Sequence, residues 1–391
     1  MPNYTTVDIL KGFLMRLLCL QENLNKGLGI VSRAVPTRTT LPITQNVLMT
    51  TDNGKIKLVT TNLEIAISTW VGAQIEDGGS VAIPAKLLSE LVNSLPNGQI
   101  SISNSKNPTG IEINCDRFNS QVNGTNPDDF PPIPTVNADV VATIDSKIFQ
   151  DAITRVSIAA AIDESRPVLT GIKMELEEDN FTLASADGFR LAVFKGKLLE
   201  KISEKCEFIL PSRSLQEINR IIVNQDEPII FSVTPSKNQA MFKLSNVEIV
   251  TQLLQGAFPD YSQLIPESHQ TKTIVPVEEF QRAVKTASVF ARDGSGILKL
   301  HINSSDNENP EKLLILSRSE EVGENESQLE ATVQGEDSKI AFNSKYLADV
   351  LSIIKEEKVV IETTSPSSPG LLKPLGNENY THVIMPMFVQ W

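Results

Sequence analysis

Three stretches of the chain share one nine-residue pattern. Residues 83–91 read Ile-Pro-Ala-Lys-Leu-Leu-Ser-Glu-Leu, residues 210–218 read Leu-Pro-Ser-Arg-Ser-Leu-Gln-Glu-Ile, and residues 342–350 read Phe-Asn-Ser-Lys-Tyr-Leu-Ala-Asp-Val. Each opens with an apolar residue, Pro or Asn, a small residue and a base, which is typical of a strand that ends where a helix begins. The apolar residues that follow have helical spacing. The three stretches start 127 and 132 residues apart.

A second helical pattern recurs with nearly the same period. Residues 24–32, 149–157 and 280–288 each begin with a large apolar residue, end with Ser, and start 125 and 131 residues apart. Solenoid repeats are only ~20–50 residues long, so this longer period indicates whole domains in tandem.

Proline-rich segments at 129–134 and 260–266 end the first two repeats and are natural linkers. We therefore predict an N-terminal extension at 1–14, followed by three domains of one fold at 15–137, 138–268 and 269–391.

Each repeat is expected to be an α+β domain with two helices and about eight strands. The helices are predicted at 21–35, 85–95, 146–161, 212–223, 278–292 and 343–355. Short alternating segments between them, separated by Asn-Gly, Asp-Gly and Gly-Gly turns, predict strands, for example at 55–60, 64–70, 99–103, 181–185, 229–233, 240–244 and 313–317. The acidic run at 320–326 is predicted to be a loop.

Composition is that of a globular protein, with 40% hydrophobic and 21% charged residues. No window approaches the ~18 apolar residues of a membrane helix, and the start lacks the features of a secretory signal. Cys19, Cys115 and Cys206 are widely spaced, so neither a disulfide framework nor a zinc site is expected. We expect reduced core thiols in a cytoplasmic protein without a membrane association.

Basic residues concentrate on the predicted helices. The six helices carry twelve bases and seven acids, a net +5, which leaves −18 for the remainder of a chain whose net charge is −13. The bases are Lys26, Arg33, Lys86, Lys147, Arg155, Arg213, Arg220, Arg282, Lys285, Arg292, Lys345 and Lys355. Although the acidic total argues against nucleic acid, a basic surface of repeated helices suits sequence-independent contact with phosphates. The alternative is a set of ordinary solvated helix faces.

The spacing of these bases supports a shared surface. In the helix from Glu278, Arg282 and Lys285 lie off the apolar stripe that contains Phe280 and Val284. Lys147 and Arg155, eight residues apart, are likewise expected to share a face away from the apolar positions of their helix.

Five local motifs resemble the bacterial beta sliding clamp family, and the resemblance covers residues 15–387. They are Arg-Thr-Thr-Leu-Pro-Ile at 38–43, Ser-Arg-Pro-Val-Leu-Thr-Gly at 165–171, Asp-Gly-Phe-Arg-Leu-Ala at 187–192, Phe-Pro-Asp-Tyr at 258–261 and Val-Ile-Met-Pro-Met at 383–387. Phe189 departs from the family's usual His or Tyr.

The resemblance implies a non-catalytic processivity factor in which two subunits join head to tail. The resulting ring of six domains would surround double-stranded DNA, with Arg38, Arg166 and Arg213 as its foremost DNA contacts. Surface ion pairs are the alternative role for these arginines. The other expected DNA contacts are the helical bases Lys26, Arg33, Lys147, Arg155, Arg220, Arg282 and Lys285.

The resemblance also implies a pocket for short peptides with hydrophobic ends, between the second and third domains. Its positions here are Gly188, Phe189, Arg190, Leu191, Pro259, Leu264, Val383, Met385, Pro386 and Met387. Methionines suit a surface that repacks around different peptides, although plain core residues are the alternative. The expected partners are the polymerase alpha subunit, the clamp loader, repair polymerases, ligase and mismatch-repair factors.

The subunit contact implied by the resemblance maps to Phe118 against Val289 and Phe290. The family usually begins near Met15 and stops shortly after Met387, whereas this chain continues through Phe388–Trp391. We expect this tail to lie beside the peptide pocket and to fold over it.

Two other classes of function remain open from the residues. An enzyme is disfavoured because no phosphate-loop, dinucleotide, zinc-protease or nucleophile-elbow motif is present, and no cofactor or metal is expected. A scaffold that binds only protein would make the basic helices coincidental, and it predicts no salt-resistant retention on circular DNA.

Overall fold

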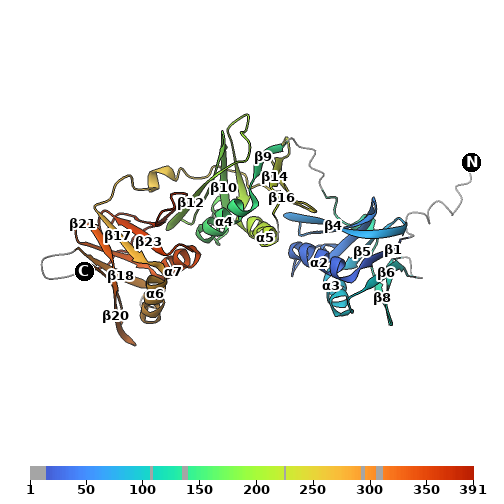
Figure 1. Cartoon of the computed structure of the whole chain (residues 1–391), viewed down its shortest axis with the longest axis horizontal. Helices are drawn as coiled ribbons and strands as arrows, with labels where there is room; N and C mark the ends of the chain where they lie inside the picture. The colour runs from blue at the N-terminus through green and yellow to red at the C-terminus, as the bar shows by residue number, and fades with distance from the viewer. Residues whose placement is uncertain (1–14, 106–108, 134–139, 224–225, 292–295, 305–310) are drawn as a thin grey trace, which may run out of the picture. The chain divides into compact units, whose positions relative to one another are not determined.

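The computed structural model describes residues 15–105, 109–133, 140–223, 226–291, 296–304 and 311–391. The predicted extension at 1–14, the boundary at 137/138 and Arg292 lie outside the described residues. The chain forms two compact units, Met1–Ser146 with Arg220–Leu253, and Lys147–Asn219 with Leu254–Trp391 (Figure 1).

The first unit is built on a twelve-stranded sheet, whose main path runs β8-β7-β6-β1-β4-β16-β15-β14-β9. Off this path, β2 pairs with β3 and β5, and β3 pairs with β4. The strands are β1 (Arg16–Leu20), β2 (Asn46–Asp52), β3 (Lys55–Thr61), β4 (Ile65–Asp77), β5 (Ser80–Pro84), β6 (Gln99–Asn104), β7 (Gly110–Cys115), β8 (Phe118–Asn123), β9 (Val140–Ile144), β14 (Ile229–Val233), β15 (Gln239–Lys243) and β16 (Val247–Gln252).

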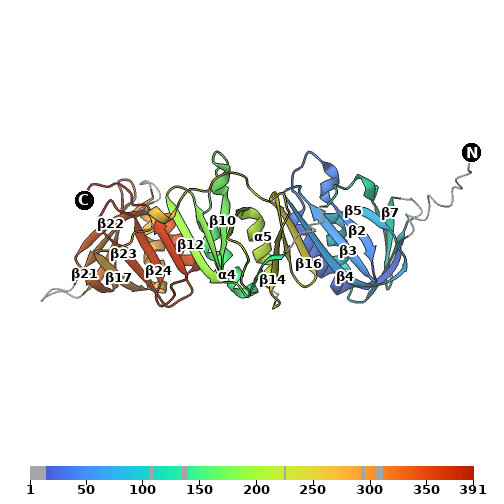
Figure 2. The same cartoon turned by 90° about the horizontal axis from the view of Figure 1, so that it is seen from above.

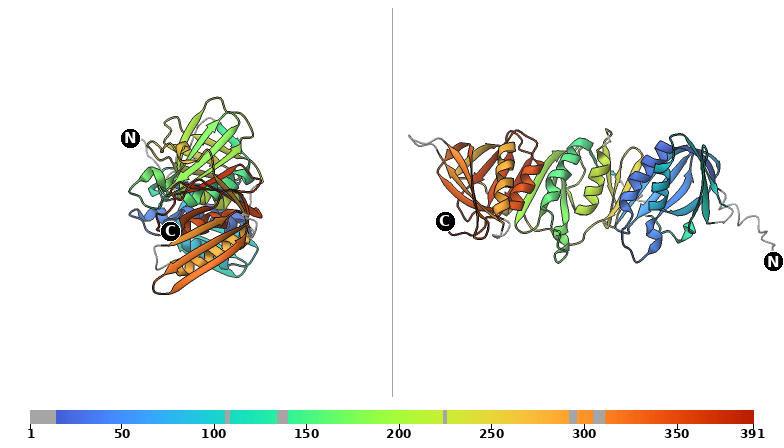
Figure 3. Two further views of the ribbon diagram at one scale, coloured as in Figure 1. Left: turned by 90° about the vertical axis from the view of Figure 1, so that its left-hand side faces the viewer. Right: turned by 90° about the horizontal axis from the view of Figure 1, so that it is seen from below.

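Two helices of the first repeat lie side by side against these strands (Figure 3). Helix α2 (Gln21–Val31) continues into the short η1 (Ser32–Ala34), and α3 (Ala85–Ser94) follows β5. Their buried residues, which include Leu24, Leu28 and Leu88, are spaced three to four apart and form one apolar stripe on each helix. The remaining short helices are η2 (Pro42–Gln45) and η3 (Pro127–Asp129).

The second unit contains a nine-stranded sheet of order β13-β10-β11-β12-β25-β24-β23-β17-β21 and a four-stranded sheet of order β20-β19-β18-β22. The strands are β10 (Gly171–Glu177), β11 (Asn180–Ala186), β12 (Arg190–Lys197), β13 (Cys206–Pro211), β17 (Thr271–Pro276), β18 (Ile297–Asn303), β19 (Lys312–Ser319), β20 (Gly323–Glu330), β21 (Thr332–Gly335), β22 (Ser338–Asn343), β23 (Lys358–Thr363), β24 (Gly370–Pro374) and β25 (Tyr380–Ile384).

The helices of the second and third repeats match the predicted ranges within a few residues. They are α4 (Ser146–Val156) with η4 (Ser157–Ala159), α5 (Ser212–Ile222), α6 (Val277–Ala291) and α7 (Ser344–Ile353), besides the short η5 (Pro167–Thr170) and η6 (Ser262–Leu264). Helix α6 buries the predicted stripe, including Phe280, Ala283 and Ala287. At α7 the Asn343 side chain accepts a hydrogen bond from the Lys345 backbone N–H, as a helix N-cap does.

Strand pairing joins successive repeats within each unit. In the first unit β4 pairs antiparallel with β16, and Figure 2 shows the two strands side by side. In the second unit β12 pairs antiparallel with β25. Each of these sheets therefore combines strands of two repeats, which the proline-rich linkers in the sequence did not reveal.

One element of secondary structure was predicted wrongly. The acidic run at 320–326 is not all loop, because β20 begins at Gly323 and pairs with β19 in register along its length. Glu324 is exposed and Asn325 is half-buried, so the alternation needed for a strand is present. The density of acids in the run masked this alternation.

Candidate functional site

A tight turn at Asp187–Arg190 is the centre of the predicted peptide site. The Asp187 carboxylate accepts hydrogen bonds from the backbone N–H groups of Phe189 (2.9 Å) and Arg190 (3.1 Å). Gly188 has a φ of 95°, a conformation that glycine adopts without the strain of a Cβ. The turn leaves the Phe189 side chain 58% exposed.

The end of the chain lies against this turn. The Met385 N–H donates to the Phe189 carbonyl at 2.8 Å, next to the paired residues Arg190 and Ile384. Two residues later the Met387 N–H donates to the Ala341 carbonyl at 2.7 Å. These bonds place the terminal methionine segment beside a turn almost two hundred residues earlier in the sequence.

Beneath the turn lies a cluster of small and aliphatic side chains. It comprises Ala184, Ala186, Leu191, Val193 and Val383, with the half-buried Tyr261 and Ile265 packed against it. Leu191 and Val383 are 2% and 1% exposed, so they form the floor of the site. Leu264 at 42% and Met385 at 37% are exposed apolar side chains in addition to Phe189.

Arg190 is a structural brace for the turn. It is 8% exposed, and it makes ion pairs with Asp187 at 3.0 Å and Asp349 at 2.7 Å. Its guanidinium lies 4.5 Å from the centre of the Tyr346 ring, a distance that favours cation–π attraction. With its donors directed to these carboxylates, Arg190 orients β12 and α7 at the site.

The sequence prediction missed Tyr346. Its ring stacks on Phe189 with centroids 6.5 Å apart, and the half-buried side chain extends the apolar surface. Burial raises the pKa of its hydroxyl, with Asp187 adding to the effect. Tyr346 belongs to the repeated pattern at 342–350, but the other two copies have Leu87 and Ser214 there, so the repeat alone did not mark it.

The structure thus brings most of the predicted pocket together. The turn residues Gly188–Leu191 meet Val383 and Met385 directly, and Leu264 neighbours Ile265 of the cluster. Pro259 is exposed, and Pro386 and Met387 are half-buried. Whether these residues bind a peptide stays a prediction.

Nine of the ten predicted DNA-contacting bases are exposed, namely Lys26, Arg33, Arg38, Lys147, Arg166, Arg213, Arg220, Arg282 and Lys285. Arg213 also pairs with Glu164 at 3.5 Å, and Arg282 pairs with Glu278 at 2.9 Å. Arg166 donates to the Asp187 carbonyl at 3.0 Å.

The prediction that Arg155 contacts DNA is wrong. Its side chain is 4% exposed and pairs with Asp151 at 2.8 Å and Glu356 at 2.9 Å. Burial alone would lower the pKa of Arg155, but its bonds to Glu356 and Asp151 outweigh that penalty and raise it. Helical spacing placed Arg155 off the apolar stripe but could not show that another repeat covers that face.

The predicted subunit-contact residues are apolar and accessible. Phe118 at the start of β8 is 53% exposed and Val289 on α6 is 55% exposed, while Phe290 is half-buried. Their place at an interface stays a prediction.

The expectation that the tail folds over the peptide site is wrong. The tail lies on β18 instead, where the Gln390 carbonyl accepts a hydrogen bond from the Lys299 ammonium at 2.6 Å. The Trp391 ring lies 5.5 Å from the His301 ring. After Met387 the chain is therefore attached to the four-stranded sheet, away from the cluster under the turn.

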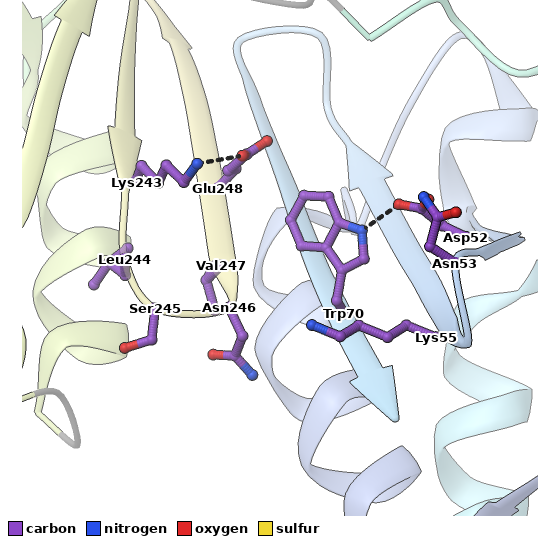
Figure 4. Close-up of a pocket in the computed structure, with 10 residues that line it drawn as sticks. All are labelled: Asp52, Asn53, Lys55, Trp70, Lys243, Leu244, Ser245, Asn246, Val247 and Glu248. Atoms are coloured by element: carbon purple, nitrogen blue, oxygen red, sulfur yellow. Dashed lines mark hydrogen bonds and ion pairs between the residues drawn. The ribbon is translucent and has the colours of Figure 1, made fainter. Parts of the chain in front are cut away.

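A polar cavity of about 400 Å³ lies in the first unit, between the β2–β3 and β15–β16 turns (Figure 4). The Trp70 indole N–H points toward Asp52 and donates to its carboxylate at 2.7 Å. Lys243 pairs with Glu248 at 3.9 Å on the opposite wall. The polar side chains on each wall are thus bonded to each other, so we interpret the cavity as the space between two neighbouring turns.

Within the described residues, no group of His, Cys, Asp and Glu side chains is arranged to hold a metal ion. Cys19 and Cys115 are buried as predicted, whereas Cys206 is half-buried. Burial raises the pKa of the Cys19 thiol to about 12. No helix in the described part of the chain has both the length and the apolar character needed to span a bilayer.

Family models for the DNA polymerase III beta subunit match three successive segments: the N-terminal domain at 15–134, the central domain at 143–260 and the C-terminal domain at 262–388. A beta sliding clamp of Staphylococcus aureus is 31% identical over 91% of this chain and 94% of its own length. That of Synechococcus elongatus is 29% identical over 95% and 99%. The crystal structure of the Bacillus subtilis DNA polymerase sliding clamp is 26% identical, covers 96% of this chain and all of its own, and has a TM-score of 0.90.

Proposed function

The chain belongs to the DNA polymerase III beta subunit family, and from that premise we infer how its exposed helical bases and its apolar turn are used. It consists of three tandem clamp domains and is a non-catalytic sliding clamp of DNA replication. We propose that two copies join head to tail in a six-domain ring around double-stranded DNA in the cytoplasm. The joint uses Phe118 against Val289 and Phe290.

The observation that carries the DNA-facing role is the exposure of nine bases on or beside related helices in an acidic chain. A few loose phosphate contacts bind weakly and without sequence preference, so the protein slides. Ring closure then prevents its escape. Processivity is a matter of topology, because tight binding would stop the sliding.

We further propose that the turn at Asp187–Arg190 binds short peptides of partner proteins. The exposed Phe189 and Met385 are bonded to each other beside a buried aliphatic cluster, and the exposed Leu264 directly precedes Ile265, which packs on that cluster. This arrangement suits a hydrophobic peptide end. The partners expected there are the polymerase alpha subunit, the clamp loader, repair polymerases, ligase and mismatch-repair factors. Competition among them for one site would order their access to DNA.

Retention on circular DNA tests the ring. The protein is loaded on nicked plasmid with a clamp loader, the plasmid is linearised in half of the sample, and both halves are gel-filtered at moderate salt. Retention on circles with loss from linear DNA is expected. Equal loss from both forms would reject the ring and favour the protein-only scaffold.

Anisotropy with a fluorescein-labelled Gly-Gln-Leu-Gly-Leu-Phe peptide tests the turn. Phe189→Arg is expected to weaken binding at least tenfold, because a charge replaces the apolar face that stacks on Tyr346. Leu199→Arg, at a leucine 52% exposed outside the site, is the matched control and should leave the affinity unchanged. Equal effects of the two substitutions would reject this site.

A further inference from the structure

The first repeat contains a second copy of the turn at Asp187. Asn62 takes the place of Asp187, and its side-chain oxygen accepts hydrogen bonds from the N–H groups of Glu64 (3.0 Å) and Ile65 (2.8 Å). Leu63 takes the place of Gly188 and has a φ of 77°. This left-handed conformation is uncommon for a residue with a branched side chain, so the surrounding structure holds the turn in this form.

At each turn, the residue that ends or follows the neighbouring strand donates its backbone N–H to a carbonyl of the turn. The Gln252 N–H donates to the Glu64 carbonyl at 2.9 Å, as the Met385 N–H donates to Phe189 at 2.8 Å. Before these bonds, β16 pairs with β4 just as β25 pairs with β12. Ala66 opposite Val250 corresponds to Leu191 opposite Val383.

A cavity of about 320 Å³ lies at this second turn, and it is lined by Thr61, Leu63, Glu64, Ile133, Val250 and Gln252 among others. Ile133 immediately precedes the proline that ends the first repeat, as Ile265 precedes Pro266. Ile265 packs on the cluster under the Asp187 turn. The cavity therefore occupies the position in the first and second repeats that the peptide site occupies in the second and third.

The side chains give this cavity a different chemistry. Glu64 replaces Phe189, and Gln252 replaces Met385 as the residue bonded to the turn. Glu64 is exposed and is the one charged residue among those that line the cavity. The volume is at the lower end of the range for ligand sites, which favours an aliphatic over an aromatic side chain.

We propose that this cavity is a second peptide-binding site, which takes an aliphatic side chain flanked by lysine or arginine. The choice of a peptide as ligand rests on the function proposed for the Asp187 turn. The carboxylate of Glu64 would pair with the flanking base, and the cavity beside it would take the aliphatic side chain. The two sites would then hold different segments of one partner, or two partners, on the same subunit.

Anisotropy with two further labelled peptides tests the proposal on the full chain. The basic probe is Gly-Lys-Val-Leu-Lys-Gly and the acidic probe is Gly-Glu-Val-Leu-Glu-Gly. Glu64→Lys should weaken binding of the basic probe at least tenfold and strengthen that of the acidic probe. Phe189→Arg should leave binding of the basic probe within twofold of the parent chain.

Glu227→Lys, at another exposed acid of the first unit, is the matched control for general attraction to an acidic protein and should change binding less than twofold. Hydrogen exchange should show protection by the basic probe at 63–66 and 250–252. Equal effects of Glu64→Lys and Glu227→Lys, loss of binding in Phe189→Arg, or no binding to the parent chain would each overturn the second site. Failure of the hydrophobic-ended peptide to bind would reject only the site at Asp187.

Discussion

Arg155 on α4 and Glu356, which follows α7, form an ion pair with their charged atoms 2.9 Å apart. The pair joins the second repeat to the third inside one compact unit. Asn377 donates a second hydrogen bond to Glu356 at 2.8 Å, and the Arg155 guanidinium lies over the buried Tyr380 ring. A base that helical spacing assigned to a DNA-facing surface thus holds two repeats together.

Removing this base should destabilise the second unit. Arg155→Ala removes the buried arginine from two partly buried carboxylates, Asp151 and Glu356. Breaking a buried pair typically costs about 3–5 kcal/mol, and the cost here should lie near the lower end because Lys355 still pairs with Asp151 and Asn377 still donates to Glu356. Arg282→Ala breaks the exposed ion pair between Arg282 and Glu278, which lie four residues apart on α6. This substitution should lower the free energy of unfolding by less than about 1 kcal/mol. Urea unfolding followed by circular dichroism measures both, and similar costs would contradict the bracing role.

The ion pair between Arg155 and Glu356 should also make the free energy of unfolding depend on pH. Burial disfavours the charged form of Glu356, but hydrogen bonds from Asn377 and Arg155 outweigh it and lower its pKa below 4.5. A carboxylate with a lowered folded-state pKa contributes stability above its unfolded pKa and loses it as pH falls through the folded value.

The free energy of unfolding of the parent chain should therefore fall more steeply between pH 5 and pH 3 than that of Glu356→Gln. The two slopes are compared by urea unfolding at fixed ionic strength. Parallel slopes would show that Glu356 is not a source of the acid sensitivity.

The exposed helical bases should set the salt dependence of DNA binding. Each phosphate contact contributes about 0.9 to the slope of log affinity against log salt. Replacing both Lys26 and Lys285 by Ala should therefore reduce the slope for a labelled duplex by roughly two. Lys205 is exposed, lies outside the helices and pairs with Glu177. Lys205→Ala is therefore the control and should leave the slope unchanged.

The accessible Phe118 should be needed for self-association. Phe118→Asp places a charge where an apolar contact is proposed, so sedimentation velocity should show a single chain. Val322→Asp alters a valine of similar exposure, 56%, at the β19–β20 turn, and should sediment like the parent chain. If the Phe118→Asp chain still sedimented as a dimer, the interface would not include Phe118.

The tail should control the titration of His301. Burial lowers the pKa of this imidazole, and Lys339 and Lys299 lower it further. Trp391→Ala removes the ring beside it, so the pKa should rise toward 6.5 in an NMR titration. His382 is the internal control, because burial lowers its pKa to about 3 independently of the tail. An unchanged His301 pKa would place Trp391 away from β18 in solution.

Removing Phe388–Trp391 should leave binding of the hydrophobic-ended peptide within twofold. The tail is attached to β18 through Lys299 and does not cover the cluster under the Asp187 turn. A large gain in affinity would instead support a tail that blocks the peptide site.

The sequence by itself determined the three repeats, the helices within a few residues and most of the strands. Periodic apolar positions and turn residues act locally, so positions such as Phe280 and Ala283 could be assigned to the core without knowing what covers them. The Asp-Gly pair at the start of the motif Asp187–Ala192 likewise predicted the turn. An Asp side chain in this position accepts hydrogen bonds from the backbone N–H groups two and three residues later. The family resemblance supplied the peptide and DNA roles.

Tertiary structure decided which helical bases are covered by another repeat and which turns have an equivalent elsewhere in the chain. Arg155 and Lys147 have similar helical surroundings in sequence, yet only Arg155 is covered, because Glu356 and Tyr380 of the next repeat pack over it. The equivalence of Asn62 with Asp187 is hidden in sequence, since an amide and a carboxylate accept the same two backbone bonds. Long-range packing sets these features, and neither the spacing nor the type of a residue records what a distant segment places beside it.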